Sequence, residues 1–426
     1  MSITGSRARA LLVLAAVATL TVTVVAGADK TLASSTAQAK GPKWIAAWAM
    51  PFTGGSTGTT PSNSTVRDIA RVSIGGTAVR IRLTNASGAT PLTIGAAYVG
   101  LQLNNSVSSG GTTVLVATPE IVTGTTRQIT FNGGQTGVSI PSGTDYIYSD
   151  PVGFPVQAQQ NLAVSLYLPG LANPAAGTTT RYTSYSTPSG TGNWAANEAG
   201  GPFTVPLALS TYALTAIDVL TTEADGAVVG LGSSTFNGWN TAPDEYQDVL
   251  TLLSVRVNRL PLGQQKGIIN AGIAGDTLHA ALATRLDRDV LSQTGVSGVI
   301  VYDVNDISTR TAGQIADDYL SLIALAHARG IKVFCPTWPP AAQSLIGQNF
   351  TGAAQRHLLN EWLMNSDVCD GVVDWDAVLR FEAGYPEEYH PDYISDGIHP
   401  NPIGHRALAD SVPLGWFVNG WPMPPQ

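Results

Sequence analysis

Charged residues and cysteines are both scarce in this chain. Asp, Glu, Lys and Arg make up 12% of the 426 residues, and the formal net charge is −8. No Lys or Arg run is present to neutralise a phosphate backbone, so we expect no nucleic-acid partner. The two cysteines, Cys335 and Cys369, form no Cys-x-x-Cys motif, and we predict neither a metal site nor a cofactor. These cysteines either pair in an oxidising compartment or stay as buried thiols.

The N-terminus has the features of an export signal. Arg7 and Arg9 precede a nearly uncharged apolar run over 10–25, and residues 26–28 (Ala-Gly-Ala) form an A-x-A cleavage pattern. The run is short for a membrane span, so we favour a cleaved signal peptide over 1–28 to a retained anchor. We therefore expect a secreted or periplasmic protein with no membrane partner after cleavage.

The remaining composition suits a β-containing extracellular protein with many loops. Hydrophobic residues make up 44% of the chain, which also holds 45 Gly and 26 Pro. Because one hydrophobic core rarely serves more than roughly 250–300 residues, we predict two domains.

Hydrophobic residues alternate with a period of two between Trp44 and residue 222. Val79, Ile81 and Leu83, for example, alternate with polar residues, and clusters rich in Gly and Ser separate such runs. Alternation interrupted by turns indicates short antiparallel strands. We predict a jelly-roll-like β-sandwich accessory domain over 44–222, preceded by a linker over 29–43.

A different rhythm holds over 223–426, where apolar strand-like runs alternate with helix-like segments. The predicted strands cover 227–231, 267–270, 296–304, 331–335 and 372–375, and the predicted helices cover 245–259, 277–291, 312–329, 353–364 and 402–412. Such alternation predicts a parallel sheet with helices on both faces, an α/β/α domain. Ligands of these sheets bind beyond the carboxyl ends of the strands.

Small or polar residues directly follow the first three of these strands. Residues 232–238 (GSSTFNG) place Ser234 in a turn, residues 270–277 (NAGIAGDT) contain Gly275, and residues 303–306 (DVND) contain Asn305. Taken singly, each segment also has an ordinary structural explanation: a plain turn, a helix N-cap and an Asx turn.

A short loop near the C-terminus combines an acid with a base. Residues 396–400 read DGIHP, so Asp396 precedes His399 by three positions. A carboxylate in that position can fix the tautomer of the imidazole and stabilise the imidazolium. His390 is the one serious rival among the other histidines, because the rest fall in predicted helices.

The joint order of these segments resembles the SGNH, or GDSL, hydrolase superfamily. The segments GLGSSTFNG, NAGIAGDT, VNDI and DGIHPN match four of its sequence blocks, and 44–50 (WIAAWAM) and 65–88 are similar to the N-terminal β-sandwich of secreted bacterial two-domain members. The resemblance covers nearly the whole mature chain. It implies a flavodoxin-like SGNH hydrolase domain over 223–426.

The resemblance also assigns roles to individual residues. It implies that Ser234 is the nucleophile, His399 the general base and Asp396 its orienting partner. The backbone N–H groups of Ser234 and Gly275 and the side chain of Asn305 would hold the oxyanion. This chemistry is coherent, since a serine attacks, a histidine moves the proton and three donors stabilise the tetrahedral anion.

Two positions depart from the family pattern. Ser233 stands where the family usually has Asp, a residue that helps to hold the nucleophile turn. Asp303 stands where the family usually has Gly, and its charge would disfavour an oxyanion if it pointed into the site.

We therefore expect a secreted serine esterase that acts through an acyl-enzyme, with a preference for short-acyl (acetyl) esters on carbohydrate. Phe236, Trp239 and Trp338 either line an apolar pocket for a longer acyl group or pack in the core. The alternatives are a long-acyl lipase or acyltransferase, and a non-catalytic polysaccharide-binding protein with a decayed SGNH domain. The expected partner is a small-molecule or polysaccharide ester, and the sequence does not indicate an oligomeric state.

Overall fold

The computed structural model describes residues 41–55, 61–109, 112–172, 175–177, 181–207, 210–340, 350–381 and 388–418. The predicted signal peptide over 1–28 and most of the predicted linker over 29–43 lie outside the described residues. Within the described ranges, no helix is long and apolar enough to cross a membrane.

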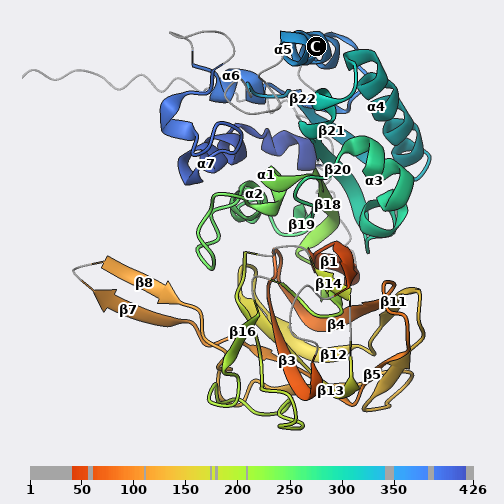
Figure 1. Cartoon of the computed structure of the whole chain (residues 1–426), viewed down its shortest axis with the longest axis vertical. Helices are drawn as coiled ribbons and strands as arrows, with labels where there is room; N and C mark the ends of the chain where they lie inside the picture. Colours follow the sequence, from red (N-terminus) through yellow and green to blue (C-terminus); the bar gives the residue numbers. More distant parts are fainter. Residues whose placement is uncertain are drawn as a thin grey trace, which may run out of the picture. The chain divides into compact units, whose positions relative to one another are not determined.

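Antiparallel sheets make up the N-terminal part of the described chain (Figure 1). A five-stranded sheet has the order β1-β17-β4-β11, with β12 also pairing with β4, and a six-stranded sheet has the order β16-β15-β3-β13-β6-β9. Their strands are β1 (Lys43–Ala49), β3 (Ser62–Arg71), β4 (Gly76–Asn85), β6 (Ala96–Leu101), β9 (Arg127–Ile129), β11 (Thr144–Tyr148), β12 (Val152–Val156), β13 (Asn161–Leu171), β15 (Ser184–Ser186), β16 (Val205–Leu207) and β17 (Leu214–Thr221). This confirms the predicted antiparallel architecture.

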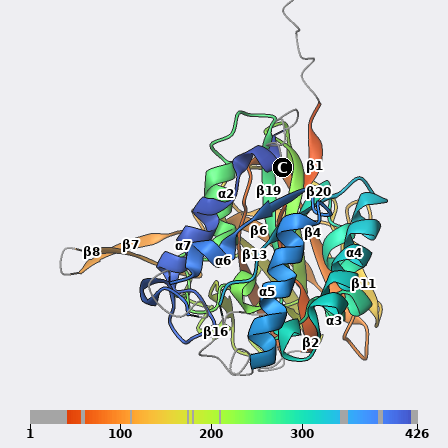
Figure 2. The same cartoon turned by 90° about the horizontal axis from the view of Figure 1, so that it is seen from above.

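Three further strand pairs flank these sheets. They are β5 (Leu92–Ile94) with β10 (Val138–Ile140), β2 (Phe52–Gly55) with β14 (Ala175–Gly177), and β7 (Asn105–Ser109) with β8 (Thr112–Val116). The β7–β8 hairpin extends away from the other strands, as the view in Figure 2 also shows.

The C-terminal part contains a parallel sheet, as predicted. Its order is β19-β18-β20-β21-β22, which is the flavodoxin-like order 2-1-3-4-5. Its strands are β18 (Ala224–Gly232), β19 (Gln265–Gly272), β20 (Val296–Tyr302), β21 (Lys332–Pro336) and β22 (Gly371–Val373). Because β18 lies between β19 and β20, the order of the strands reverses at β18, and a ligand site is expected beyond its carboxyl end.

Helices cover both faces of this sheet (Figure 1). Helices α2 and α7 pack against each other on one face, and α3, α4 and α5 form the layer on the other face. The helices are α1 (Ser234–Asn237), α2 (Val249–Val257), α3 (Leu278–Thr284), α4 (Ala312–His327), α5 (Phe350–Asn365), α6 (Trp375–Leu379) and α7 (Pro402–Ser411). Short η segments, one π-helical and three 3₁₀, are η1 (Asp287–Leu291), η2 (Asn305–Ser308), η3 (Pro391–Tyr393) and η4 (Leu414–Phe417).

Two predicted elements differ from the structure. The helix predicted over 277–291 is divided into α3 and η1, because the backbone leaves the helical conformation at Arg285, with φ −142°, where the side chain turns inwards. Trp375 was predicted in a strand, but it begins α6. Asp374 caps this helix by accepting a hydrogen bond from the Ala377 amide.

The change from antiparallel to parallel pairing falls between β17, which ends at Thr221, and β18, which begins at Ala224. Contacts across this point are close: the Ile268 amide donates to Ser73 Oγ at 3.1 Å, and a Cβ on Gly267 would lie 2.2 Å from the Ala46 carbonyl oxygen. By its contacts the chain from Lys40 onwards is one unit, so the predicted domain boundary at 222/223 stays a prediction.

Cys335 and Cys369 form a disulfide. The S–S distance is 2.01 Å and the Cα atoms are 6.1 Å apart. The bond ties β21 to the residues just before β22, and it settles the alternative between paired and free thiols in favour of the pair.

Candidate active site

Close backbone contacts at two glycines shape the turn that carries Ser234. This residue begins α1, two positions after β18 ends at Gly232. A Cβ on Gly232 would lie 2.1 Å from the Tyr302 carbonyl oxygen, and one on Gly272 would lie 2.9 Å from the Ser233 carbonyl oxygen. Only glycine permits this close approach, so the sequence places the Ser234 hydroxyl beyond the end of β18, where the order of the strands reverses.

Ser234, His399 and Asp396 form one chain of hydrogen bonds. His399 Nε2 lies 2.8 Å from Ser234 Oγ, and His399 Nδ1 lies 2.7 Å from Asp396 Oδ2. The other oxygen, Asp396 Oδ1, accepts hydrogen bonds from the His399 and Ile398 amides, at 2.9 and 3.1 Å. A carboxylate on Nδ1 keeps the proton there, so the lone pair of Nε2 faces the hydroxyl.

The electrostatics of Asp396 favour its charged form. Partial burial would raise the pKa of this carboxyl, but the hydrogen bonds from the His399 amide and ring and from the Ile398 amide outweigh it and lower the pKa to about 2. Asp396 is therefore a carboxylate throughout the neutral range, as an orienting partner of His399 must be.

The three predicted oxyanion donors lie on the segments that follow β18, β19 and β20. The Ser234 amide is in the first turn of α1, and Gly275 adopts a left-handed conformation with φ +80°. The Asn305 side chain donates one hydrogen bond from Nδ2 to the Asp276 carbonyl at 2.8 Å, which fixes the amide beside Gly275. An amide NH₂ has two protons, so the second can still donate to a substrate oxygen.

Asp303 and Ser233, the two departures from the family pattern, are both buried. Burial raises the pKa of Asp303 well above its usual range, against a hydrogen bond from the Asn305 amide that lowers it. The protonated form that this favours places less negative charge near the donors. Ser233 makes no side-chain cap for α1, and the turn is instead closed by the Asn237 amide, which donates to the Ser233 carbonyl at 3.0 Å.

Residues 231–407 match the profile of the GDSL-like Lipase/Acylhydrolase family, and this range contains every residue of the site. These residues are a GDSL-like lipase/acylhydrolase domain. A search of curated proteins found no significant match to the chain.

Several solved structures are similar to less than half of the chain. A GDSL-like lipase from Bacteroides thetaiotaomicron is 21% identical, with a TM-score of 0.36, and the match covers 44% of this chain and 85% of that one. An acetyl xylan esterase is 22% identical, with a TM-score of 0.35 and coverages of 43% and 96%. A lipase/acylhydrolase from Enterococcus faecalis is 19% identical, with a TM-score of 0.36 and coverages of 43% and 92%.

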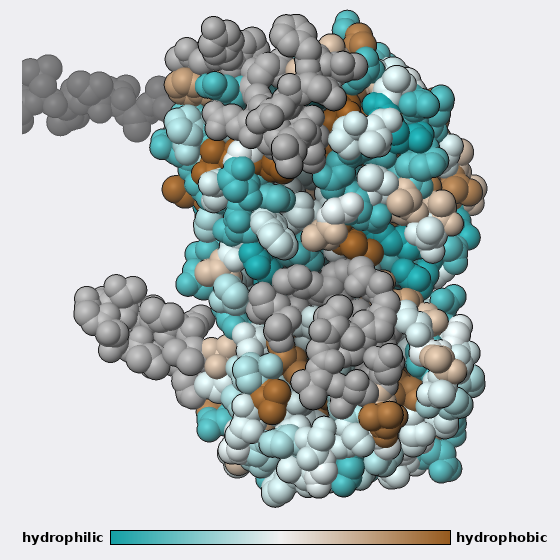
Figure 3. Space-filling model, viewed as in Figure 1, coloured by the Kyte–Doolittle hydropathy of each residue, from teal (hydrophilic) through white to brown (hydrophobic). Residues whose placement is uncertain are grey.

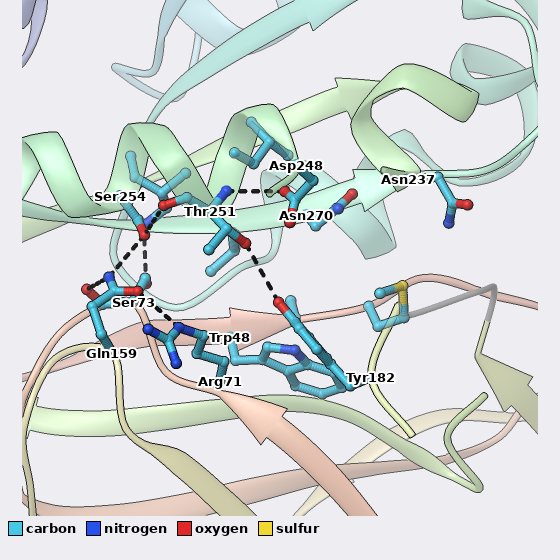
Figure 4. Close-up of a pocket in the computed structure, with 15 residues that line it drawn as sticks. Trp48, Arg71, Ser73, Gln159, Tyr182, Asn237, Asp248, Thr251, Ser254 and Asn270 are labelled. Carbon is cyan, nitrogen blue, oxygen red and sulfur yellow. Dashed lines mark hydrogen bonds between the residues drawn. The ribbon is translucent and has the colours of Figure 1, made fainter. Parts of the chain in front are cut away.

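One cavity lies apart from Ser234, His399 and Asp396. A polar cavity of about 30 Å³ lies where residues of the antiparallel sheets meet α2 (Figure 4). Gln159 Nε2 donates to Ser254 Oγ at 2.8 Å, and the hydroxyls of Tyr182 and Thr251 are 3.4 Å apart. This space suits one or two water molecules rather than a substrate, and neither Ser234 nor His399 lines it.

Arg285 is a residue of the acylhydrolase domain whose role the sequence did not reveal. Its side chain is 4% exposed, and it donates to the Ala271 carbonyl at 2.7 Å and to Asp276 Oδ2 at 2.6 Å. It also reaches the Gly232 carbonyl at 3.4 Å, so one guanidinium joins the ends of β18 and β19. The predicted helix over 277–291 gives no signal for this role, because Arg285 stands there next to the charged residues Asp287, Arg288 and Asp289.

We expect Arg285→Met to destabilise the protein strongly. The substitution keeps much of the side-chain volume but leaves the carboxylate of Asp276 without its buried cation, which typically costs about 3–5 kcal/mol, while Asp289 keeps its pair with Arg288. The free energy of unfolding in urea measures the effect. The matched control is Arg329→Met, whose pair with Asp287 is 48% and 68% exposed and should contribute about 1 kcal/mol or less. Equal losses in the two variants would contradict this role.

His405, in α7, supports the backbone at Trp239. It is fully buried, and its Nε2 lies 3.1 Å from the Trp239 carbonyl oxygen. Burial lowers the pKa of His405 to about 4, against the hydrogen bond with Trp239, which raises it. The neutral ring therefore donates from Nε2 at neutral pH.

This shift predicts a pH-dependent stability. Above pH 6.5, which is the ordinary pKa of a histidine, His405 is neutral in both the folded and the unfolded protein. Between pH 6.5 and about 4, only the unfolded chain binds the proton. The free energy of unfolding therefore falls as the pH falls through this range. The loss from this group is at most roughly 3 kcal/mol. Urea unfolding at a series of pH values should show a smaller loss in His405→Gln than in the wild type. The control His279→Gln changes a 57% exposed ring and should retain the wild-type slope; identical slopes in all three proteins would refute the prediction.

Proposed function

We propose that this protein is a serine ester hydrolase in which Ser234 is the nucleophile. One observation carries the proposal: His399 contacts Ser234 Oγ at 2.8 Å through Nε2 and Asp396 at 2.7 Å through Nδ1. A hydroxyl, an imidazole and a carboxylate in this order are the groups that acyl transfer to serine requires. The family of the acylhydrolase domain agrees with this chemistry.

The reaction would run in two halves. Ser234 Oγ attacks the ester carbonyl while His399 Nε2 takes its proton, and the negative charge develops on the carbonyl oxygen facing the Gly275 amide and the Asn305 side chain. The C–O bond to the alcohol then breaks, and His399 gives its proton to the leaving oxygen. Water, deprotonated by His399, attacks the acyl-enzyme, releases the acid and restores the Ser234 hydroxyl.

An open site supports short-acyl esters carried on a large polar molecule. The Asp396 side chain is 40% exposed and that of His399 is 14% exposed, so the triad lies near the surface. Two of the three aromatic side chains that were candidates for an acyl pocket, Phe236 and Trp338, are fully buried in the core. On the face shown in Figure 3, hydrophobic side chains of the described residues lie in small spots among hydrophilic ones. The N-terminal segment adds secretion to this proposal.

A profile of acyl-chain length tests the proposed function. Hydrolysis of p-nitrophenyl acetate, butyrate and octanoate should be fastest for acetate, and acetate should be released from acetylated polysaccharide into water. A preference for octanoate would indicate a lipase, and acetyl transfer to an added alcohol without acid release would indicate an acyltransferase. The absence of turnover on every ester, with retention on polysaccharide, would favour the non-catalytic alternative.

A further inference from the structure

Trp239 is a large apolar side chain left exposed beside the triad. It follows Ser234 by five positions, and 40% of its surface is accessible. Its ring centroid lies 5.8 Å from that of His399, with the planes inclined by 37°. Large aromatic side chains gain most from burial, so packing in the core does not explain this position.

The backbone around Trp239 is held on several sides. Its amide donates to the Ser234 carbonyl at 3.0 Å, and its carbonyl accepts from His405 at 3.1 Å. The preceding Gly238 carbonyl accepts from Arg181 Nε and from the Thr241 hydroxyl, at 2.8 and 2.7 Å. The backbone that carries the indole is therefore held in place, and a ligand that contacts the indole need not order this segment first.

The position of Trp239 also indicates which half of an ester it contacts. His399 Nε2, which takes the proton from Ser234, must later deliver it to the oxygen of the leaving alcohol. That oxygen therefore lies on the imidazole side, while the carbonyl oxygen turns towards Gly275 and Asn305. Because Trp239 packs beside the imidazole, it lies on the side of the alcohol and not on that of the oxyanion.

We propose that Trp239 binds the alcohol half of the substrate and that this alcohol is a sugar ring; the inference rests on the proposed esterase function. A pyranose has an apolar C–H face that can stack on an indole and a polar edge that needs hydrogen-bonding neighbours. Polar groups near Trp239 reach the surface: Asn240, the next residue, is partly exposed, and the side chain of Asp396 is 40% exposed.

A fatty alcohol would instead need a continuous apolar surface. Among the described residues, Trp239 is the one exposed large hydrophobic side chain in the segments 232–240, 272–276, 303–306 and 395–399 that form the site. An isolated aromatic surface surrounded by polar groups fits a sugar better than an alkyl chain.

Two acetyl esters with different alcohols test this inference. Acetate release is measured from an acetylated methyl xyloside and from ethyl acetate, so that the acyl group, the nucleophile and the oxyanion donors are the same. In Trp239→Ala we expect KM for the glycoside to rise about tenfold, and the ratio of kcat/KM for glycoside to that for ethyl acetate to fall by a similar factor. Trp239→Phe should recover most of the ratio, because it restores an aromatic face.

The matched control is Trp194→Ala. Trp194 is a 37% exposed tryptophan in the antiparallel part of the chain, and its removal should leave both rates and their ratio unchanged. An equal loss on both esters in Trp239→Ala would show that the residue acts on the triad and would overturn the inference. So would a ratio that does not change, or a larger loss on octyl acetate than on the glycoside. Wild-type turnover of ethyl acetate but not of the glycoside would overturn the sugar assignment alone, whereas no turnover of any ester would overturn the proposed function as well.

Discussion

Ser234→Ala is expected to reduce kcat for p-nitrophenyl acetate by about 10³-fold to 10⁶-fold, with little change in stability. In the proposed mechanism the hydroxyl oxygen bonds to the acyl carbon, and His399 Nε2, 2.8 Å away, takes its proton. Without the hydroxyl, only hydrolysis by water near the oxyanion donors remains. Initial rates at saturating ester, together with the free energy of unfolding, measure the two quantities.

The neighbouring serine provides the control for this substitution. Ser233→Ala removes a buried hydroxyl that makes no capping hydrogen bond, and it leaves the turn closed by the Asn237 amide. This variant should retain most of the activity. If Ser233→Ala loses activity and Ser234→Ala keeps it, the assignment of the nucleophile is wrong.

Asp396→Asn should reduce kcat by about 10³-fold to 10⁴-fold. An amide of the same shape can donate its N–H to His399 Nδ1, which moves the ring proton to Nε2 and removes the base that faces Ser234. Since the pKa of Asp396 is about 2, the wild-type carboxylate stays charged as the pH falls from 7 to 4. Any loss of wild-type activity in that range should therefore come from a group other than Asp396.

Asp392→Asn is the matched control, because it makes the same change four residues away. Asp392 is 76% exposed and lies 3.8 Å from His390, outside the triad. The activity of Asp392→Asn should remain close to that of the wild type from pH 7 to pH 4. A comparable loss in both variants would show that net charge, and not the bond to His399, is what matters.

The parts of the site that follow strands could be predicted from the sequence. Ser234, Gly275 and Asn305 stand directly after β18, β19 and β20, and the sheet order brings these three ends together. The pair Asp396 and His399 is a local arrangement within one loop, so its geometry depends little on distant contacts. The pattern of strands and helices in each half was also sufficient to predict the fold class of that half.

The residues that support the site could not be found in this way. Arg285 and His405 fall on helix patterns, where a polar residue usually faces solvent, and only the packed structure shows that both are buried. The same holds for Asp303, whose raised pKa depends on burial that no local pattern reveals. Trp239 illustrates the opposite case, since its sequence context left core packing open and the structure shows the side chain exposed.

Trapping the acyl-enzyme is the most direct measurement. The protein is mixed with p-nitrophenyl acetate, quenched in acid during turnover, digested and mapped by mass spectrometry. Acetylation should be found on Ser234 and should disappear in Ser234→Ala. The acetyl-enzyme should accumulate more when its hydrolysis is slowed. Acetylation of Ser233 or of another residue, or turnover that continues undiminished in Ser234→Ala, would contradict the mechanism.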